Sequence, residues 1–266
     1  MRHFGVLVGV LAVSLVGAAS GVAVSSAAPP DGITVVPVYG QAAGHGLRLF
    51  VDVFYARGGN PGPPGGGGGG GGGPSGGGTV DCTDTNNNLG SSEPFATASP
   101  LITLAMNSSV DDTLKPAVTA AAKTWSDEGA GLNVVDGGES NSPSNDGVST
   151  IGWIRIAPKK VLAATWSWID ANNRIIEADV FFNTSYKWAV LDDCPLTGEL
   201  TGVLPSTGQF DVGDIAVHEF GHVLGLSHYS DTGAQATMYP SAPADEVRKR
   251  TLTPGDIAAL SAPLTP

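Results

Sequence analysis

Cysteine is nearly absent from this sequence of 266 residues, which contains only Cys82 and Cys194. Two cysteines exclude a small scaffold held together by several disulfides, and they exclude a zinc site built from cysteine alone. They leave room for one disulfide bridge.

Positive charge is scarce as well. The chain has 13 basic residues against 25 acidic ones, and its formal net charge is −12. A protein that bound nucleic acid or anionic lipid through its overall field would carry the opposite sign. The composition therefore disfavours both kinds of partner.

Long apolar runs are missing beyond the first 28 residues. The basic start Met1-Arg2-His3 is followed by an apolar run over 4–19 and by small residues. This order is typical of a secretory signal peptide cleaved after residue 27 or 28. The alternative is a membrane anchor, but the run is shorter than the roughly 20 residues of a spanning helix. We therefore expect a signal peptide at 1–28 and a secreted, extracellular protein without membrane insertion.

Glycine and proline are in excess, and they gather in one stretch. Residues 58–78 contain 15 Gly and 4 Pro. Such a stretch has few side chains to bury and much backbone entropy to lose, so it predicts a disordered linker. Upstream, 29–57 holds two runs that could pair as strands, GITVVPVYG and LRLFVDVFYA, but is too short to bury a core alone. Its role stays open between a pro-segment, an adhesive strand pair and the remnant of a longer domain.

Residues 79–266 are long enough for a single domain, and their pattern predicts a mixed α+β fold. A helix is expected over 111–126, capped by its first acidic residues, because apolar residues recur there at helical spacing: Leu114, Val118, Ala122 and Trp125. Further helices are expected at 212–224 and from Thr253-Pro254 onwards. Strands are expected at 101–106, 132–135, 149–156, 161–168 and 174–182, the last two as a hairpin.

Three of the five histidines fall in one segment that reads HEFGHVLGLSH and begins at His218. His218 and His222 are four residues apart, so on a helix both imidazoles project from one face and can bind one metal ion. Gly225 suits the left-handed residue that ends a helix, after which the chain can return His228 as a third ligand. Three imidazoles with an open fourth position are typical of catalytic zinc.

Glu219 lies between the first two histidines in sequence. From there its carboxylate can reach a metal-bound water and act as general base. Zinc lowers the pKa of such a water towards about 7 and polarises a carbonyl oxygen. The combination suits amide hydrolysis.

The segment matches the HExxHxxGxxH motif of the metzincin metallopeptidases, and the following Ala236–Pro240 resembles their Met-turn. The sequence around His228 and Met238 is similar to that of the matrixin branch of that clan. An astacin-like metzincin would place a metal-binding Tyr where Pro240 stands. The resemblance implies a zincin α+β domain with a twisted mixed sheet, a long active-site helix and a Met-turn.

The resemblance also implies roles around the zinc. A substrate would add to an edge strand as an extra antiparallel strand, with backbone partners from Ala163, Ala164 and Thr165. Tyr239 and Pro240 would form part of the wall of the pocket for the residue after the scissile bond. Met238 would pack under the imidazoles as a support.

Departures from the animal matrixins concern further metals. Ala164 and Phe181 stand where those proteins carry histidines of a structural zinc, so we expect one zinc only. Asn183 and Tyr186 replace acidic calcium ligands, whereas Asp179 keeps an acidic position. Calcium therefore stays possible, against a solvated or hydrogen-bonded carboxylate.

The cysteines have two interpretations in an exported protein. A Cys82–Cys194 bridge would connect the start of the domain to the loop before the zinc helix. Alternatively, Cys82 could bind the zinc and keep a zymogen inactive, as the prodomain cysteine of animal matrixins does. The neighbours Asp81 and Thr83 differ, however, from the Arg-Cys-Gly sequence that surrounds that cysteine.

Together, the motif and the resemblance imply a secreted zinc endopeptidase that acts on peptides or proteins and is monomeric. One alternative is a non-catalytic surface or adhesion protein that uses the zinc fold as a scaffold; it would be indicated by a damaged motif, and this motif is complete. Another is a zinc hydrolase of non-peptide amides, which the edge strand and Met-turn disfavour.

Overall fold

The computed structural model describes residues 40–41, 47–57, 96–97, 99–156, 160–191, 207–228 and 237–260. The expected signal peptide, the glycine-rich stretch, Cys82 and Cys194 lie outside these residues. Within the described part, no helix is long and apolar enough to cross a membrane.

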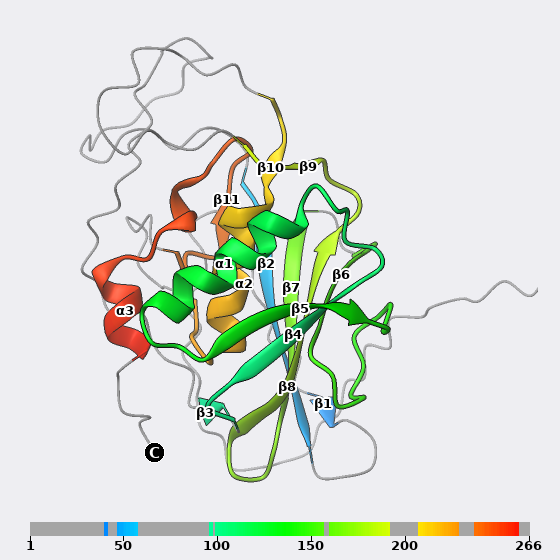
Figure 1. The fold of residues 1–266 in the computed structure, drawn as a ribbon, viewed down its shortest axis with the longest axis vertical. Helices are drawn as coiled ribbons and strands as arrows, with labels where there is room; N and C mark the ends of the chain where they lie inside the picture. Colours follow the sequence, from blue (N-terminus) through cyan, green and yellow to red (C-terminus); the bar gives the residue numbers. More distant parts are fainter. Residues whose placement is uncertain are drawn as a thin grey trace, which may run out of the picture.

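In the part of the chain that the structure describes, the body is a mixed sheet of nine strands (Figure 1). Its strands are β1 (Gly40–Gln41), β2 (Arg48–Ala56), β3 (Ala96–Thr97), β4 (Ile102–Asn107), β5 (Leu132–Gly138), β6 (Thr150–Ile154), β7 (Val161–Ile169), β8 (Arg174–Asn183) and β11 (Ser241–Ala242). The order across the sheet is β1-β2-β7-β8-β6-β4-β5, with β11 paired to β2 and β3 paired to β8. A separate pair joins β9 (Trp188–Ala189) and β10 (Phe210–Asp211).

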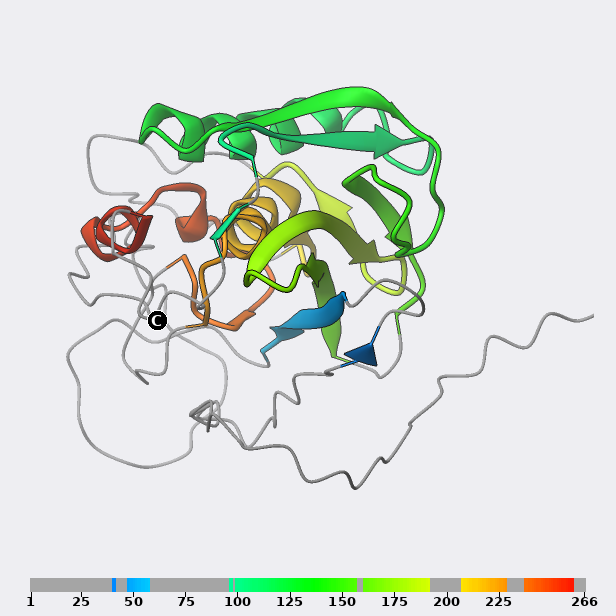
Figure 2. The same cartoon turned by 90° about the horizontal axis from the view of Figure 1, so that it is seen from below.

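The helices are α1 (Lys115–Asp127), α2 (Val212–Val223) and α3 (Pro254–Leu260), with a short 3-10 helix at Arg248–Arg250. Figure 2 shows α2 in the concave side of the curved sheet, with α1 beside it. The indole Nε1 of Trp125 in α1 donates a hydrogen bond of 2.8 Å to the Val217 carbonyl in α2. The predicted α+β fold class is confirmed, and α2 is fixed by both a helix and a sheet.

The expected elements of the 79–266 region are present, with small shifts at their ends. The hairpin is formed by β7 and β8, and its turn places Asn173 at φ 59°, a conformation that asparagine tolerates. Helix α3 is capped as expected, because the Thr253 hydroxyl accepts from the Asp256 amide at 3.1 Å.

The predicted acidic cap of α1 is wrong. The N-cap residue is Leu114, and no side chain caps the helix. Asp111 instead accepts hydrogen bonds from the amide and the hydroxyl of Thr113. A short polar side chain can bond its own neighbouring backbone in a turn, and here this local turn competes successfully with the cap.

Strand β2 comes from the segment whose role the sequence left open. Among the described residues, the end of the first run pairs with the second through Gly40↔Leu49, and the following Gln41 pairs with Arg48. Over most of its length β2 pairs instead with β7, from Arg48↔Ile169 to Tyr55↔Val161. Residues upstream of the glycine-rich stretch are therefore part of the same sheet as the region downstream of it.

Candidate metal centre

Helix α2 begins at a strong cap. Asp211 has extended backbone angles, and its Oδ1 accepts a hydrogen bond of 2.7 Å from the Asp214 amide. Every residue of the helix is buried. The helix therefore presents its side chains to the protein interior on all sides, among them His218, Glu219 and His222.

Gly225 ends the helix as the sequence predicts. Its φ is 86°, in the left-handed region that favours glycine. The Leu226 amide donates to the Gly221 carbonyl and the Gly225 amide to the His222 carbonyl, both at 2.9 Å, which is the pattern of a Schellman motif. The reversal of the chain brings His228 back to the first two histidines.

The three Nε2 atoms converge. They are 3.1 Å apart between His218 and His222, 3.0 Å between His222 and His228, and 3.2 Å between His218 and His228. Nitrogens at this spacing can all lie about 2.0–2.1 Å from one ion, the usual distance for zinc–imidazole bonds. Among the residues that the structure describes, this is the only cluster of three potential metal ligands.

The protonation of the imidazoles favours a cation between them. His218 Nδ1 lies 2.6 Å from the Thr237 carbonyl, and His222 Nδ1 lies 2.7 Å from the Leu226 carbonyl. A carbonyl only accepts, so these Nδ1 atoms carry the protons and Nε2 keeps its lone pair. Burial lowers the pKa of both rings, that of His222 to about 4, so they are neutral. Lone pairs that face one another repel unless a cation lies between them, and the site fits a zinc ion for this reason.

Glu219 is fully buried beside the histidines. Its Oε2 accepts a hydrogen bond of 2.6 Å from the Thr165 hydroxyl, whereas Oε1 has no hydrogen-bond partner among the described residues. Burial raises the pKa of the Glu219 carboxyl to about 8. A base whose pKa is close to neutral can both accept and return a proton.

The residue expected as a support lies under the helix. Met238 is buried, and a Cβ built on Gly221 would lie only 2.3 Å from its sulfur and 3.1 Å from the Trp125 ring. The residue before it, Thr237, supplies the carbonyl that holds His218. Residues 237–238 therefore contact helix α2 through both backbone and side chain.

We expect Gly221→Ala to destabilise the protein by about 1–3 kcal/mol, because the new methyl group overpacks the space held by the Met238 sulfur and the Trp125 ring. Urea unfolding of the purified variant measures the change. Gly213→Ala in the same helix is the matched control, since its Cβ would meet no atom closer than 3.2 Å. Equal stability of the two variants would contradict the close packing under the histidines.

The expected edge strand is β7, and its edge is already paired. Ala163, Ala164 and Thr165 are buried and pair on one side with β8. On the other side they pair with Phe54, Val53 and Asp52 of β2. The expected pocket wall also contacts β2, because the Pro240 carbonyl accepts from the Tyr55 amide at 3.0 Å.

Several contributors were not identified from the sequence. Thr165 was expected to act through its backbone, but its hydroxyl also holds Glu219. Trp125 was expected only as a core residue, and the strand β2 was not connected to the site at all. No local pattern signals these contacts, since each joins segments far apart in the chain.

The acidic position considered for calcium is engaged with the backbone. Asp179 accepts hydrogen bonds from the amides of Thr150 at 2.7 Å and Ser144 at 3.0 Å. Ala164 and Phe181, at the positions considered for a second zinc, face each other across β7 and β8. The hydrogen bonds of Asp179 favour the interpretation as a bonded carboxylate, and calcium use stays a prediction.

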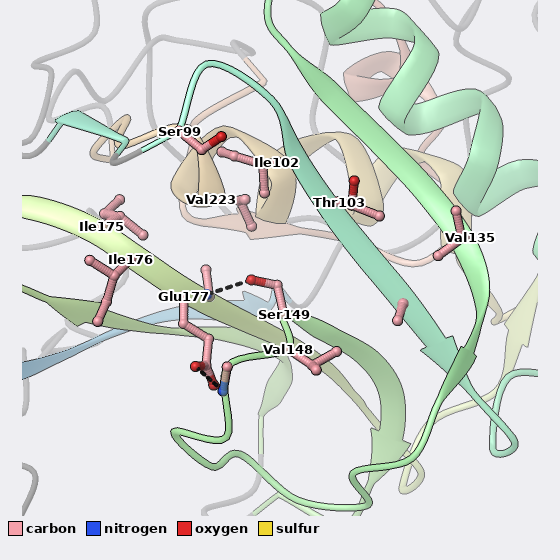
Figure 3. A pocket seen from close by; sticks show the side chains of 13 residues that line it. Ser99, Ile102, Thr103, Val135, Val148, Ser149, Ile175, Ile176, Glu177 and Val223 are labelled. Atoms are coloured by element: carbon pink, nitrogen blue, oxygen red, sulfur yellow. Dashed lines mark hydrogen bonds between the residues drawn. The ribbon is translucent and has the colours of Figure 1, made fainter.

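A hollow of about 380 Å³ lies between β4 and β8, and Figure 3 shows side chains that line it. Its lining comes mainly from β4, β8 and the residues before β6, and it includes no histidine. Its carboxylate, Glu177, accepts hydrogen bonds from the amides of Asp146 and Gly147. The chemistry of the candidate site is therefore separate from this hollow.

Comparison with known proteins agrees with the geometry. Residues 157–262, less than half of the chain, match the family model described as matrixin. Metalloendoproteinase 1 from Glycine max is 51% identical over 53 residues, which are 20% of this chain and 16% of that protein. The match thus spans only a small part of the length of this relative.

Proposed function

We propose that this chain, which carries a matrixin-like metzincin domain, is a secreted zinc-dependent endopeptidase. The observation that carries the proposal is the convergence of three histidine Nε2 atoms within 3.0–3.2 Å, beside a buried Glu219. His218, His222 and His228 would hold one zinc ion. When bound there, zinc supplies an acidified water and a polarised substrate carbonyl.

Two residues of the chain would transfer the proton and position the base. Glu219 accepts a proton from the attacking water at its carboxylate and later passes it to the leaving amine. Thr165 keeps the carboxylate in place through the 2.6 Å hydrogen bond to Oε2. The amine and carboxylate products form without a covalent bond to the protein.

We propose an extended peptide as the substrate, because a strand of a sheet can pair with the backbone of such a peptide. Strand β7 would bind an extended peptide by backbone pairing along the side that β2 now occupies, with Tyr239 and Pro240 beside the residue after the scissile bond. An adhesion protein that uses the fold only as a scaffold would not need a buried carboxylate held beside three converging imidazoles. We further propose a monomer with a Cys82–Cys194 bridge.

Metal removal tests the proposal. We expect the zinc-loaded chain to cut a mixed peptide library, and we expect a chelator to abolish the cuts and added zinc to restore them. Because β2 lies along the same edge, the assay is run on the intact chain and on chain cut within 58–78 by an unrelated protease. Cleavage read by mass spectrometry that persists in the chelator would contradict a zinc peptidase, and so would its absence from both zinc-loaded forms.

A further inference from the structure

We propose that strand β2 is a built-in competitor for the substrate, which occupies the groove beside the histidines in the direction and register of a bound peptide. The inference rests on the proposed function, because the groove receives substrate only if the domain is a peptidase. It assigns to residues 48–56 a role that the sequence left open.

The first observation is that β2 is held from both sides. It runs antiparallel to β7 and parallel to β11, where Tyr55 pairs with Ser241 and Ala56 with Ala242. The Ala56 amide donates to the Lys160 carbonyl at 2.7 Å, and the Arg57 amide donates to the Ala242 carbonyl at 2.8 Å. A peptide that entered between the edge strand and the wall after Met238 would use these same backbone groups.

The second observation is the register over the metal ligands. The Phe54 ring centroid lies 4.2 Å from that of His218, and Asp52 Oδ2 lies 3.6 Å from His222 Nδ1. The residue between them is Val53. The backbone of 52–54 therefore passes beside the histidines. The peptide bond that joins Val53 to Phe54 lies directly before the residue whose ring contacts His218.

The third observation is the burial of Phe54. Its side chain is fully buried, and the Lys249 ammonium lies 5.9 Å from its ring centroid. The next amide, of Tyr55, bonds to the Pro240 carbonyl of the expected pocket wall. Phe54 thus takes the place expected for the residue after the scissile bond.

The ends of the strand add further contacts. The Arg57 guanidinium lies 5.5 Å from the ring centroid of Tyr239 and 3.9 Å from the Glu246 carboxylate. Phe50 and Val51 are buried near the other end. Removal of the strand would expose apolar surface of about the kind that a bound peptide covers.

The covalent connection makes this competition intramolecular. The residues between 56 and 96 join strand β2 to strand β3, and the glycine-rich composition of 58–78 predicts a tether that holds the strand at an effective concentration on the order of millimolar. A free peptide substrate at micromolar concentration would have to displace the strand. We therefore expect the intact chain to be a weak enzyme.

The test uses the full zinc-loaded chain with a recognition sequence for an unrelated protease inserted within 58–78. Hydrolysis of a fluorogenic peptide is measured before the cut and after cutting and dilution. We expect activity to rise at least about tenfold once the strand is no longer tethered. Unchanged activity after the cut would overturn the proposal. Loss of the folded circular dichroism spectrum on dilution would also overturn it, because β2 would then be an integral strand.

A synthetic peptide of residues 46–57 gives the second arm. Added to the cut chain, it should raise KM for the fluorogenic peptide and leave kcat unchanged, as a competitor does. A Phe54→Asp peptide should be at least tenfold weaker, whereas the matched Val53→Thr peptide, altered at a half-buried position, should retain most of its potency. Equal potency of all three peptides would contradict the register. A hydrolysed 46–57 peptide should show Phe54 as the new amino terminus, and a cut at another bond would contradict the register as well.

A binding measurement separates the two proposals. Anisotropy of the fluorescently labelled 46–57 peptide is measured with the cut chain that carries Glu219→Gln, so that binding is read without hydrolysis. If the peptide binds but the cut wild-type chain hydrolyses nothing, the proposed peptidase fails and the occupied groove remains. If the cut chain is active but the peptide neither binds nor inhibits, the competitor proposal fails and the peptidase remains.

Discussion

Replacing Glu219 with glutamine is expected to lower kcat/KM for peptide hydrolysis by about 10²–10⁴-fold, while zinc stays bound. Glutamine has nearly the same shape and can still accept the hydrogen bond that the Thr165 hydroxyl donates at 2.6 Å. It can neither accept a proton from the attacking water nor pass one to the leaving amine, so the lost rate reports these two proton transfers. Steady-state kinetics on the cut chain measures the change, and metal analysis confirms that the zinc content is unchanged.

Thr165→Val is the companion variant. It removes the hydroxyl that holds the Glu219 carboxylate but leaves the carboxylate itself and the strand pairing of β7. We expect a smaller loss, on the order of tenfold, because the base is present but less well oriented. Full activity of the glutamine variant would exclude Glu219 as the base, whatever the result with Thr165.

The second large effect concerns the start of helix α2. Asp211→Ala should lower the free energy of unfolding by about 3–5 kcal/mol. Asp211 Oδ1 accepts hydrogen bonds of 2.7 Å from the Asp214 amide and 2.8 Å from Arg250 Nε, and Oδ2 accepts one of 2.9 Å from the Leu191 amide. Its removal uncaps the helix and deprives a mostly buried guanidinium of its carboxylate. Urea unfolding of the zinc-loaded chain measures the loss.

Asp127→Ala provides the matched control. Asp127 also pairs with a cation, the Lys123 ammonium, but both side chains are exposed at the end of α1. Such a surface pair contributes about 0–1 kcal/mol, so this variant should unfold close to the wild type. If Asp211→Ala were equally mild, the buried ion pair could not be what stabilises the start of helix α2.

The local parts of the fold were accessible from the sequence. Helix α1 was predicted from apolar residues at steps of three and four, and Val118, Ala122 and Trp125 are all buried. The β7–β8 hairpin was predicted from two strand-like runs around a short turn-rich spacer. These predictions succeed because the periodicity of side chains along one element depends only on that element.

Predictions were less secure where one residue or strand could choose between several partners. Asp111 was expected to cap α1, and it bonds Thr113 instead. Both outcomes use the same carboxylate and neighbouring amides, and the sequence does not rank them. The partner of the LRLFVDVFYA run was a harder question, since a strand pattern does not specify which other strand it joins.

The sequence by itself determined the candidate metal ligands and the candidate base. His218 and His222 lie on one helical face because of their spacing, and Gly225 permits the turn that returns His228, so all three positions follow from short-range geometry. Only the tertiary structure decided what surrounds them: the Thr165 hydroxyl on Glu219, the Thr237 carbonyl on His218, and β2 along the edge of β7. The physical reason is that these contacts join segments brought together by burial and strand pairing across long stretches of chain, and such contacts leave no periodic trace in the sequence.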